Sequence, residues 1–234
     1  MICAIHQPQY LPWLGYFEKM SRADVFVLLD NVQFKKNEWQ NRNRIRTSQG
    51  WQWLTVPVLH DHGQLICDVK FNSSRHWRED HVRAIELNYK KAPFFDVYWP
   101  RLRLIYEKDW KALGELNIAL VTLLAEFLGI ATEIKIASKL NVSSEKTQRL
   151  IDICRARHCD TYLAGAGCAE YMDFAAFKVA GIKVDVQSYN HPAYPQLWTG
   201  ADVGFQPFMS VIDLLFNCGE KSKTVLLNQV AIKT

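Results

Sequence analysis

Hydrophobic and polar positions alternate in blocks along the chain, and the first blocks predict a strand, a loop, a helix and a second strand. Residues 2–6 (Ile-Cys-Ala-Ile-His) form a short apolar run typical of a buried strand. Pro8 and Pro12 predict a loop, because proline cannot donate to a strand ladder or continue a helix interior. From Trp13 onward, apolar residues recur at helical spacing: Leu14, Phe17 and Met20. Residues 24–30 form another apolar run, so we expect a unit that begins a parallel sheet.

The rest of the chain continues this alternation of strand-like and helix-like blocks. Strand-like runs follow at residues 51–57, 133–137, 160–165 and 182–187. Helical patterns follow at residues 74–89, 110–128, 147–154, in a short segment before Gly181, and at 210–219, where a glycine stops the helix. Ser143 is the predicted N-cap of the helix at 147–154. Residues 31–50 are polar and basic without a clear period, which predicts a long loop.

Strands that alternate with helices are typical of a sheet whose strands run mostly parallel. We therefore predict an α/β fold with a mostly parallel sheet in a three-layer, Rossmann-like arrangement with added helices. The sequence contains no internal repeat, low-complexity segment or linker. Residues 1–234 are accordingly predicted to form a single domain.

Composition and charge narrow the class of protein. Hydrophobic residues make up 49% of the chain and charged residues 22%, a balance that excludes disordered and fibrous classes. The net charge of +4 arises from 28 basic and 24 acidic residues, so nucleic-acid binding through overall charge is not predicted.

The cysteines and histidines do not predict a metal site. The six cysteines are scattered without the C-x₂-C spacing of zinc and redox sites, so we expect reduced thiols. His60-Asp61-His62 lacks a third ligand at a defined spacing.

The start of the chain is too short and too soon polar for a secretory signal, and no window approaches the roughly 20 apolar residues of a membrane span. We expect a complete cytoplasmic chain.

Polar residues follow the first predicted strand and are candidates for the functional site. His6 ends that strand, where binding residues gather in open α/β sheets, and its imidazole could donate to a phosphate or act as a general acid or base. The alternative is a core histidine that is bonded to a backbone carbonyl. Gln7, Gln9 and Tyr10 add polar groups to the same loop and are predicted to bind substrate.

Asp30 and Gln33 follow the second predicted strand, so the sheet rule places them beside His6. Asp30 is a candidate catalytic residue that could also bind a ribose, a metal or an ammonium group. A turn cap is the alternative interpretation of Asp30.

The basic segment and two later loops complete the candidate site. Lys35, Arg42 and Arg44 could hold a phosphate or carboxylate, because guanidinium groups offer paired hydrogen bonds; a solvated basic loop is the alternative. Two further loops supply the other candidates: Gly165 and Gly167 after a strand, where backbone could approach a ligand, and His191 and Tyr194, which could close over the site as a lid. A tight turn and a plain surface loop are the respective alternatives.

Several long motifs strongly resemble the WbqC-like family. They lie at residues 6–19 (HQPQYLPWLGYFEK), 23–24, 30–34, 39–45, 162–167, 191–196 and 210–219. The resemblance covers essentially the whole chain. It implies a bacterial protein of the kind met in gene clusters for O-antigen and other surface polysaccharides, and in some specialised-metabolite clusters.

The first strand, loop and helix are also similar to the H-x-G-H arrangement of nucleotidyltransferase and pantothenate-synthetase-type enzymes. In those enzymes the loop and the helix N-terminus hold the phosphates of ATP or CTP. Trp13 and Tyr16 stand here in place of the two histidines, so His6 would have to supply the imidazole.

Together these features predict an enzyme, a transferase or an amide-forming ligase, that tailors a nucleotide-sugar or glycan precursor. The expected reaction is a nucleotide-dependent acyl or aminoacyl transfer that forms an amide, with ATP or another nucleotide as the cofactor. The expected partner is a nucleotide or nucleotide-sugar, and a homo-oligomer is compatible with the sequence. The alternative is a non-catalytic subunit that binds a nucleotide-sugar or a partner enzyme within a polysaccharide assembly.

Overall fold

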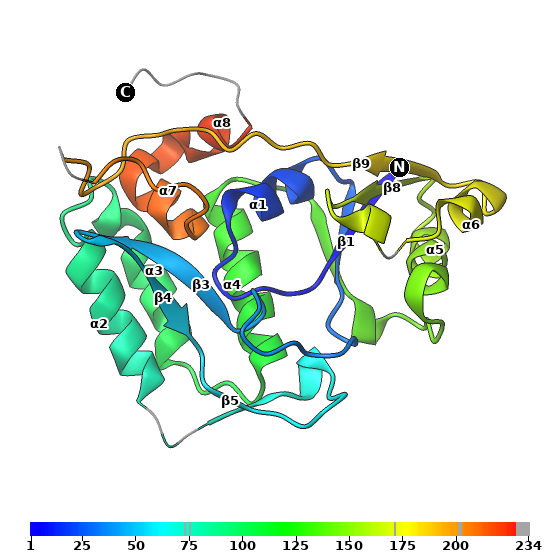
Figure 1. Ribbon diagram of the computed structural model, residues 1–234, viewed down its shortest axis with the longest axis horizontal. Helices are drawn as coiled ribbons and strands as arrows, with labels where there is room; N and C mark the ends of the chain where they lie inside the picture. The colour runs from blue at the N-terminus through cyan, green and yellow to red at the C-terminus, as the bar shows by residue number, and fades with distance from the viewer. Residues whose placement is uncertain (73, 75, 171, 201–202, 228–234) are drawn as a thin grey trace.

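A computed structural model describes residues 1–72, 74, 76–170, 172–200 and 203–227 (Figure 1). Its centre is a five-stranded, wholly parallel sheet in the order β7-β2-β1-β8-β9. The strands are β1 Ile2–His6, β2 Val25–Leu28, β7 Glu133–Ile136, β8 Thr161–Ala164 and β9 Lys183–Val186. The first strand is central, and the chain adds strands on one side of it and then on the other. This confirms the predicted α/β, Rossmann-like arrangement.

Helices cover the two faces of the sheet unequally. The helices are α1 Leu14–Ser21, α2 Trp77–Tyr89, α3 Phe95–Glu107, α4 Leu113–Phe127, α5 Lys146–Ala156, α6 Phe174–Val179, α7 Val211–Cys218 and α8 Ser222–Leu226. Short 3₁₀ turns occur at Ile66–Asp68, Ala137–Lys139, Cys168–Glu170 and Gly219–Lys221. One face of the sheet packs on α5 and α6, and the other contributes to a larger core with the remaining helices (Figure 1).

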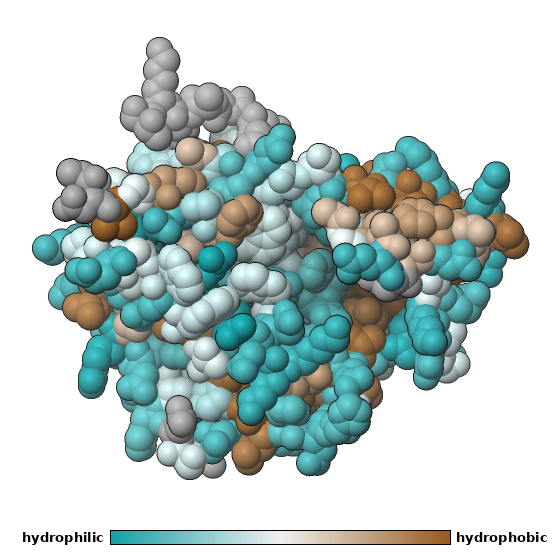
Figure 2. All heavy atoms as spheres, in the orientation of Figure 1, coloured by the Kyte–Doolittle hydropathy of each residue, from teal (hydrophilic) through white to brown (hydrophobic). Residues whose placement is uncertain are grey.

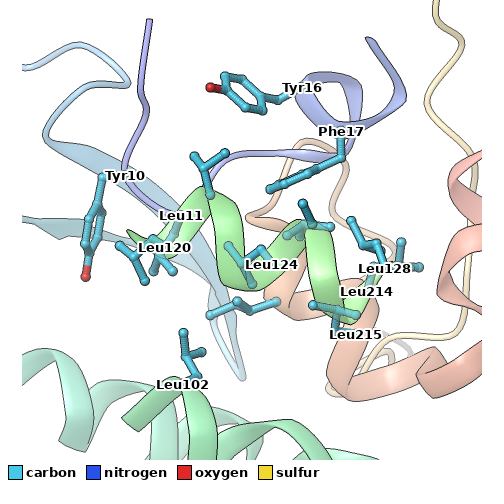
Figure 3. Packing of buried hydrophobic residues seen from close by; sticks show 14 of the residues in the cluster. Tyr10, Leu11, Tyr16, Phe17, Leu102, Leu120, Leu124, Leu128, Leu214 and Leu215 are labelled. Carbon is cyan, nitrogen blue, oxygen red and sulfur yellow. The ribbon is translucent and has the colours of Figure 1, made fainter. Parts of the chain in front are cut away.

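The larger core is organised around α4. Figure 3 shows Leu120 of α4 beside Tyr10 and Leu11, whereas Leu124 and the C-cap residue Leu128 lie toward Leu214 of α7 and Phe17 of α1; all of them are fully buried or nearly so. These leucines recur every four residues, as the amphipathic pattern of this segment predicts. No helix within the described residues has both the length and the apolar character that a bilayer span requires.

The prediction of a long loop over residues 31–50 is wrong. β3 (Arg42–Thr47) pairs antiparallel with β4 (Gly50–Thr55), and a second small ribbon joins β5 (Val58–Leu59) to β6 (Lys70–Phe71). The apolar signal of β3 is weak because Asn43 occupies an inward position, where its amide donates to the carbonyl of Leu11 at 2.6 Å. Satisfied hydrogen bonds take the place of apolar burial at that position.

Two other local predictions also differ from the structure. Helix α3 was not predicted, since Pro100 lies inside it. Ser143 does not cap α5, which begins at Lys146 with Glu145 in the cap position. The helix at 210–219 is confirmed: the Ser210 side chain caps α7, and Gly219 ends it with a φ of +57°.

Candidate functional site

The carboxyl ends of β1 and β8 diverge at the point where the strand order reverses. β1 stays paired with β2 as far as His6 and Leu28, but its pairing with β8 ends at Ala4 and Leu163. Figure 2 shows the surface hollowed between the part of the molecule that carries β3 and β4 and the part that carries α5 and α6. Ligands of open α/β sheets bind in the crevice outside such a reversal. We call the region formed by residues 5–7 and 165–168 the switch-point crevice.

A lysine ammonium lies at the base of this crevice. Nζ of Lys19, on α1, donates to the carbonyl of Ile5 at 2.9 Å, directly beyond the last pair of the β1–β8 ladder. The side chain is only 2% exposed, and burial lowers the pKa of Lys19 to about 8, although Cys3 and Cys168 favour the charged form. Within the described part of the chain, no carboxylate lies in ion-pair range of Nζ. An ammonium has three donors, and the bond to Ile5 uses one of them.

His6 lies beside this ammonium at the end of β1. Its Nδ1 lies 3.2 Å from the carbonyl of Gln7, and its ring packs edge-on against Tyr16 with centroids 4.7 Å apart. Because a carbonyl can only accept, Nδ1 carries the hydrogen and Nε2 presents a lone pair. Burial, and then the charge of Lys19, lower the pKa of His6 to about 3 against the opposing effect of the Gln7 carbonyl. His6 is therefore neutral at pH 7, which suits an acceptor or a general base rather than a phosphate donor.

Glutamines and an asparagine fix the loop that follows His6. Oε1 of Gln7 accepts from Nε2 of Gln40 at 2.7 Å, and the Asn117 amide of α4 donates to the carbonyls of Pro8 and Gln40. Gln9 is 7% exposed, and its Oε1 is a buried acceptor without a partner in the described residues. Buried acceptors are seldom left unpaired, so a ligand or a water is expected there.

Tyr10 belongs to the core rather than to the site. Its side chain is fully buried, and its hydroxyl lies 2.7 Å from both Nδ1 of His81 and the hydroxyl of Tyr106. Figure 3 shows the ring among the buried leucines. The predicted substrate contact through Tyr10 is therefore not supported by its position.

The first turn of α1 is covered and offers no phosphate site. The Trp13 indole folds over Gly15, where an added Cβ would lie 2.2 Å from the ring. Val211 N–H donates to the carbonyl of Pro12, and Trp13 bridges to Ser210. The phosphate-binding helix start that the H-x-G-H likeness implies is thus closed by protein atoms.

Asp30 accepts hydrogen bonds from Ser138, which lies far away in the sequence, and not from its own turn. Its two carboxylate oxygens accept from the backbone N–H of Ser138 at 2.8 Å and from the Ser138 hydroxyl at 2.6 Å, joining the ends of β2 and β7. A cleft of about 430 Å³ opens beside it. The lining residues include Cys67, whose thiol pKa burial raises to about 11, so a reactive thiolate is not indicated.

We predict that Asp30→Ala lowers the free energy of unfolding by about 1–2 kcal/mol, because Ser138 loses both acceptors. Urea unfolding measures the change. Asp61→Ala is the control, since the Asp61 side chain is exposed, and it should change stability by less than about 0.5 kcal/mol. Loss of ligand binding or activity with unchanged stability would contradict the structural role of Asp30 as the acceptor for Ser138.

The remaining predicted residues of the 31–50 segment lie on β3 or in the stretch before it. Gln33 is exposed and forms a backbone bridge with Leu65. Lys35 has an exposed side chain, and its backbone N–H donates to Oε1 of Gln40. Arg42 and Arg44 are half-buried on β3 among tryptophans. The structure thus keeps the guanidinium pair together but places it on β3 rather than in a loop.

The glycines of the 165–168 turn border open space. Neither Gly165 nor Gly167 has a positive φ, and an added Cβ at either position would meet no atom within 4 Å. A close backbone approach by a ligand is compatible with this turn, although the backbone conformation does not itself require glycine.

His191 is part of an aromatic cluster with its ring nitrogens already bonded. It stacks on Trp13 with an interplanar angle of 8°, its Nδ1 lies 2.8 Å from the carbonyl of Pro192, and Nε2 accepts from the N–H of Phe208 at 3.1 Å. Burial lowers its pKa, so the ring stays neutral. The predicted role of His191 in a lid over the substrate is not supported by these contacts.

Tyr194 belongs to a buried polar network around Asp213. The Asp213 carboxylate, which is fully buried, accepts from the hydroxyls of Tyr89 at 2.9 Å and Tyr194 at 2.8 Å, and from Nε2 of Gln196 at 2.6 Å. The Tyr89 hydroxyl in turn accepts from the backbone N–H of Arg46. Burial raises the pKa of Asp213 against the three donors. The side chains of Tyr194 and Gln196 therefore hold this part of the chain to α7 through Asp213.

Comparison with known proteins agrees with the motifs of the sequence. The family model described as "WbqC-like protein family" matches residues 7–225. The chain belongs to the WbqC-like protein family. It is 36% identical over 230 residues to a protein of Mycobacterium tuberculosis (strain ATCC 25618 / H37Rv) named "Uncharacterized protein Rv1507c", covering 95% of this chain and 96% of that protein. No solved structure matches this chain.

Sequence reasoning missed Lys19 of this WbqC-like protein, although a signal was present. Lys19 follows Tyr16 by three residues, so the two side chains share one face of α1, and the Tyr16 ring contacts His6. A lysine on the buried face of the first helix is unusual, because burial disfavours its charge. That placement identifies it as a candidate residue of the WbqC-like site.

Proposed function

We propose that this WbqC-like chain is an enzyme that tailors a nucleotide-sugar or glycan precursor, and that the switch-point crevice binds an anionic group of its substrate. One observation carries the proposal: the buried ammonium of Lys19, without a carboxylate partner in the described residues, lies where β1 and β8 diverge. A buried, unpaired charge is costly, and proteins retain such groups mainly for function. A phosphate or carboxylate would supply the missing counter-charge.

His6 gives the crevice a group that can move a proton. In the proposed reaction an amine attacks an acyl group activated by a nucleoside triphosphate, the C–N bond of an amide forms, and the phosphate-bearing leaving group departs. Nε2 of His6 accepts the proton that the amine loses. Burial is the main cause of the lowered pKa of His6, and the charge of Lys19 adds to it. An anion bound beside Lys19 would offset this second contribution, and so would make the imidazole a stronger base.

The proposed compartment is the cytoplasm, where nucleotide-activated precursors are made. All six cysteines are free, as expected in a reducing compartment.

The test combines binding with turnover. ATP, CTP, UDP-glucose and pyrophosphate are titrated by calorimetry, and every binder is then assayed for turnover with amines and carboxylates. We expect His6→Gln to keep binding within a few-fold of wild type and to lose turnover by about 10²–10⁴-fold. His62→Gln, at an exposed histidine, is the matched control and should behave as wild type. Full turnover by His6→Gln would contradict the assignment, and binding without any turnover would favour the non-catalytic subunit.

A further inference from the structure

The β3–β4 hairpin presents one face of alternating arginines and tryptophans. The register pairs Arg44 with Trp53 and Arg46 with Trp51, so these side chains share a face while Ile45 points to the core. Arg46 is fully buried, and its Nη2 donates to the carbonyls of Trp198 and Gly204. The outer part of the face remains open. We call Trp39, Arg42, Arg44, Trp51 and Trp53 the indole–guanidinium platform.

The rings of the platform form a partly exposed aromatic cluster. Trp53 lies edge-on to Trp51, with centroids 5.6 Å apart and an interplanar angle of 82°, and tilts against Trp39 at 5.7 Å and 50°. Trp51 and Trp53 are 41% and 37% exposed. Large aromatic side chains so placed in a group are unusual outside binding surfaces.

The two arginines of the platform lie over these rings and have no acidic partner among the described residues. The guanidinium carbon of Arg42 lies 4.2 Å from the Trp53 centroid, and that of Arg44 lies 5.1 Å from the Trp51 centroid. Neither arginine forms an ion pair with any residue that the structure describes, whereas Arg101 forms a two-bond pair with Glu126. Arg44 reaches only the carbonyl of Phe208, at 3.4 Å, and its Nε is buried without a partner.

We infer that the indole–guanidinium platform binds a saccharide that carries a carboxylate. Indole faces pack against the C–H surface of a sugar ring, and guanidinium edges offer paired hydrogen bonds to a planar carboxylate. Stacking on the indoles holds the guanidinium groups of Arg42 and Arg44 in orientation before the ligand arrives. This inference rests on the proposed function, for which the platform would hold the sugar acceptor and the switch-point crevice the anion of the donor.

The geometry favours a sugar over a single nucleic-acid strand. Single strands are held on successive, parallel stacking faces along a basic groove. The platform rings are instead tilted by 50° and 82° to one another, and the chain has 28 basic against 24 acidic residues.

Two oligosaccharides that differ in charge test the inference. Tryptophan fluorescence and calorimetry follow titrations of the full chain with hyaluronan tetrasaccharide, which carries carboxylates, and with chitotetraose, which is neutral. We expect at least tenfold tighter binding of hyaluronan tetrasaccharide. Equal affinity for both, no binding of either, or tighter, salt-sensitive binding of a uridine oligonucleotide would overturn the inference.

Variants locate the binding. Arg42→Gln with Arg44→Gln should weaken hyaluronan binding at least tenfold, and Trp53→Ala should do the same. Because Trp53→Ala could disturb the hairpin, the arginine variant provides the decisive measurement, with Arg101→Gln as the control that should bind as wild type. Unchanged binding by the arginine variant would also overturn the inference.

Pyrophosphate binding and turnover, measured on the same samples, separate this inference from the proposed function. If the platform inference alone fails, pyrophosphate binding and turnover persist without any hyaluronan binding. If the proposed function alone fails, hyaluronan binding that depends on Arg42 and Arg44 persists without pyrophosphate binding or turnover.

Discussion

Replacing Asp213 by alanine should lower the free energy of unfolding by about 3–5 kcal/mol, among the largest effects expected from any single change in this chain. The substitution leaves two tyrosine hydroxyls and the Gln196 amide without their common acceptor in a fully buried position. The Asp213 network also joins the β3–β4 hairpin to the 190–210 segment, because the Tyr89 hydroxyl is bonded to the backbone of Arg46. The substitution therefore weakens the contacts of α7 both with the β3–β4 hairpin, through Tyr89, and with Tyr194 and Gln196.

Urea unfolding followed by circular dichroism measures this effect. Asp109→Ala is the matched control, because Asp109 is 96% exposed and its ion pair with Arg78 is long, at 3.4 Å. The control should change stability by less than about 1 kcal/mol. If Asp213→Ala lowers the free energy of unfolding by no more than this control does, the network does not stabilise the fold.

Replacing Lys19 by methionine should weaken pyrophosphate binding at least tenfold while leaving the fold as stable as wild type or more stable. Burial lowers the pKa of Lys19 from 10.5 to about 8, so its charge at pH 7 opposes folding by about 3 kcal/mol. Losing the bond to the Ile5 carbonyl costs about 1–3 kcal/mol in return. We expect a net gain of about 0–2 kcal/mol at pH 7.

The pH dependence gives this prediction its sign. Because the folded-state pKa of Lys19 is lowered, the destabilisation is full below pH 8 and shrinks as the pH rises toward the unfolded value of 10.5. The advantage of Lys19→Met over wild type in urea unfolding should therefore decrease between pH 7 and pH 10. Lys178→Met, at an exposed lysine, is the control and should alter neither stability nor binding. A destabilised Lys19→Met that binds pyrophosphate normally would assign Lys19 a structural role.

The sheet could be predicted from the sequence because its signals are local. β1, β2 and β8 are short, mostly apolar runs between polar or glycine-containing segments, and β9 alternates valines with charged residues; each was placed within two residues at either end. β3 was missed, since the buried side chains of Asn43 and Arg46, on opposite faces of the strand, donate to carbonyls that lie far away in the sequence.

The candidate site was predictable only in part, for the same reason. The position of His6 follows from the strand that it ends, and the structure places it at the carboxyl end of β1, as predicted. Tyr10 was assigned to the site as a polar group of the loop after β1, and Tyr194 as part of a loop that could close over it. Their hydroxyl partners, His81 of α2 and Asp213 of α7, come from helices elsewhere in the chain. Lys19 could not be assigned to the site from the sequence, because its position depends on where the pairing of β1 with β8 ends.

The central claim is that Lys19 is the anion-binding group of the switch-point crevice, and a titration of its side chain tests this most directly. Protein labelled with ¹³C at the lysine Cε is titrated by NMR, with Lys19→Met assigning the resonance, in the absence and presence of saturating pyrophosphate. We predict that Lys19 titrates near pH 8 in the free protein and that pyrophosphate raises its pKa, because a bound anion favours the charged form. A Lys19 resonance that titrates at its ordinary value near 10.5, or that ignores bound pyrophosphate, would contradict the claim.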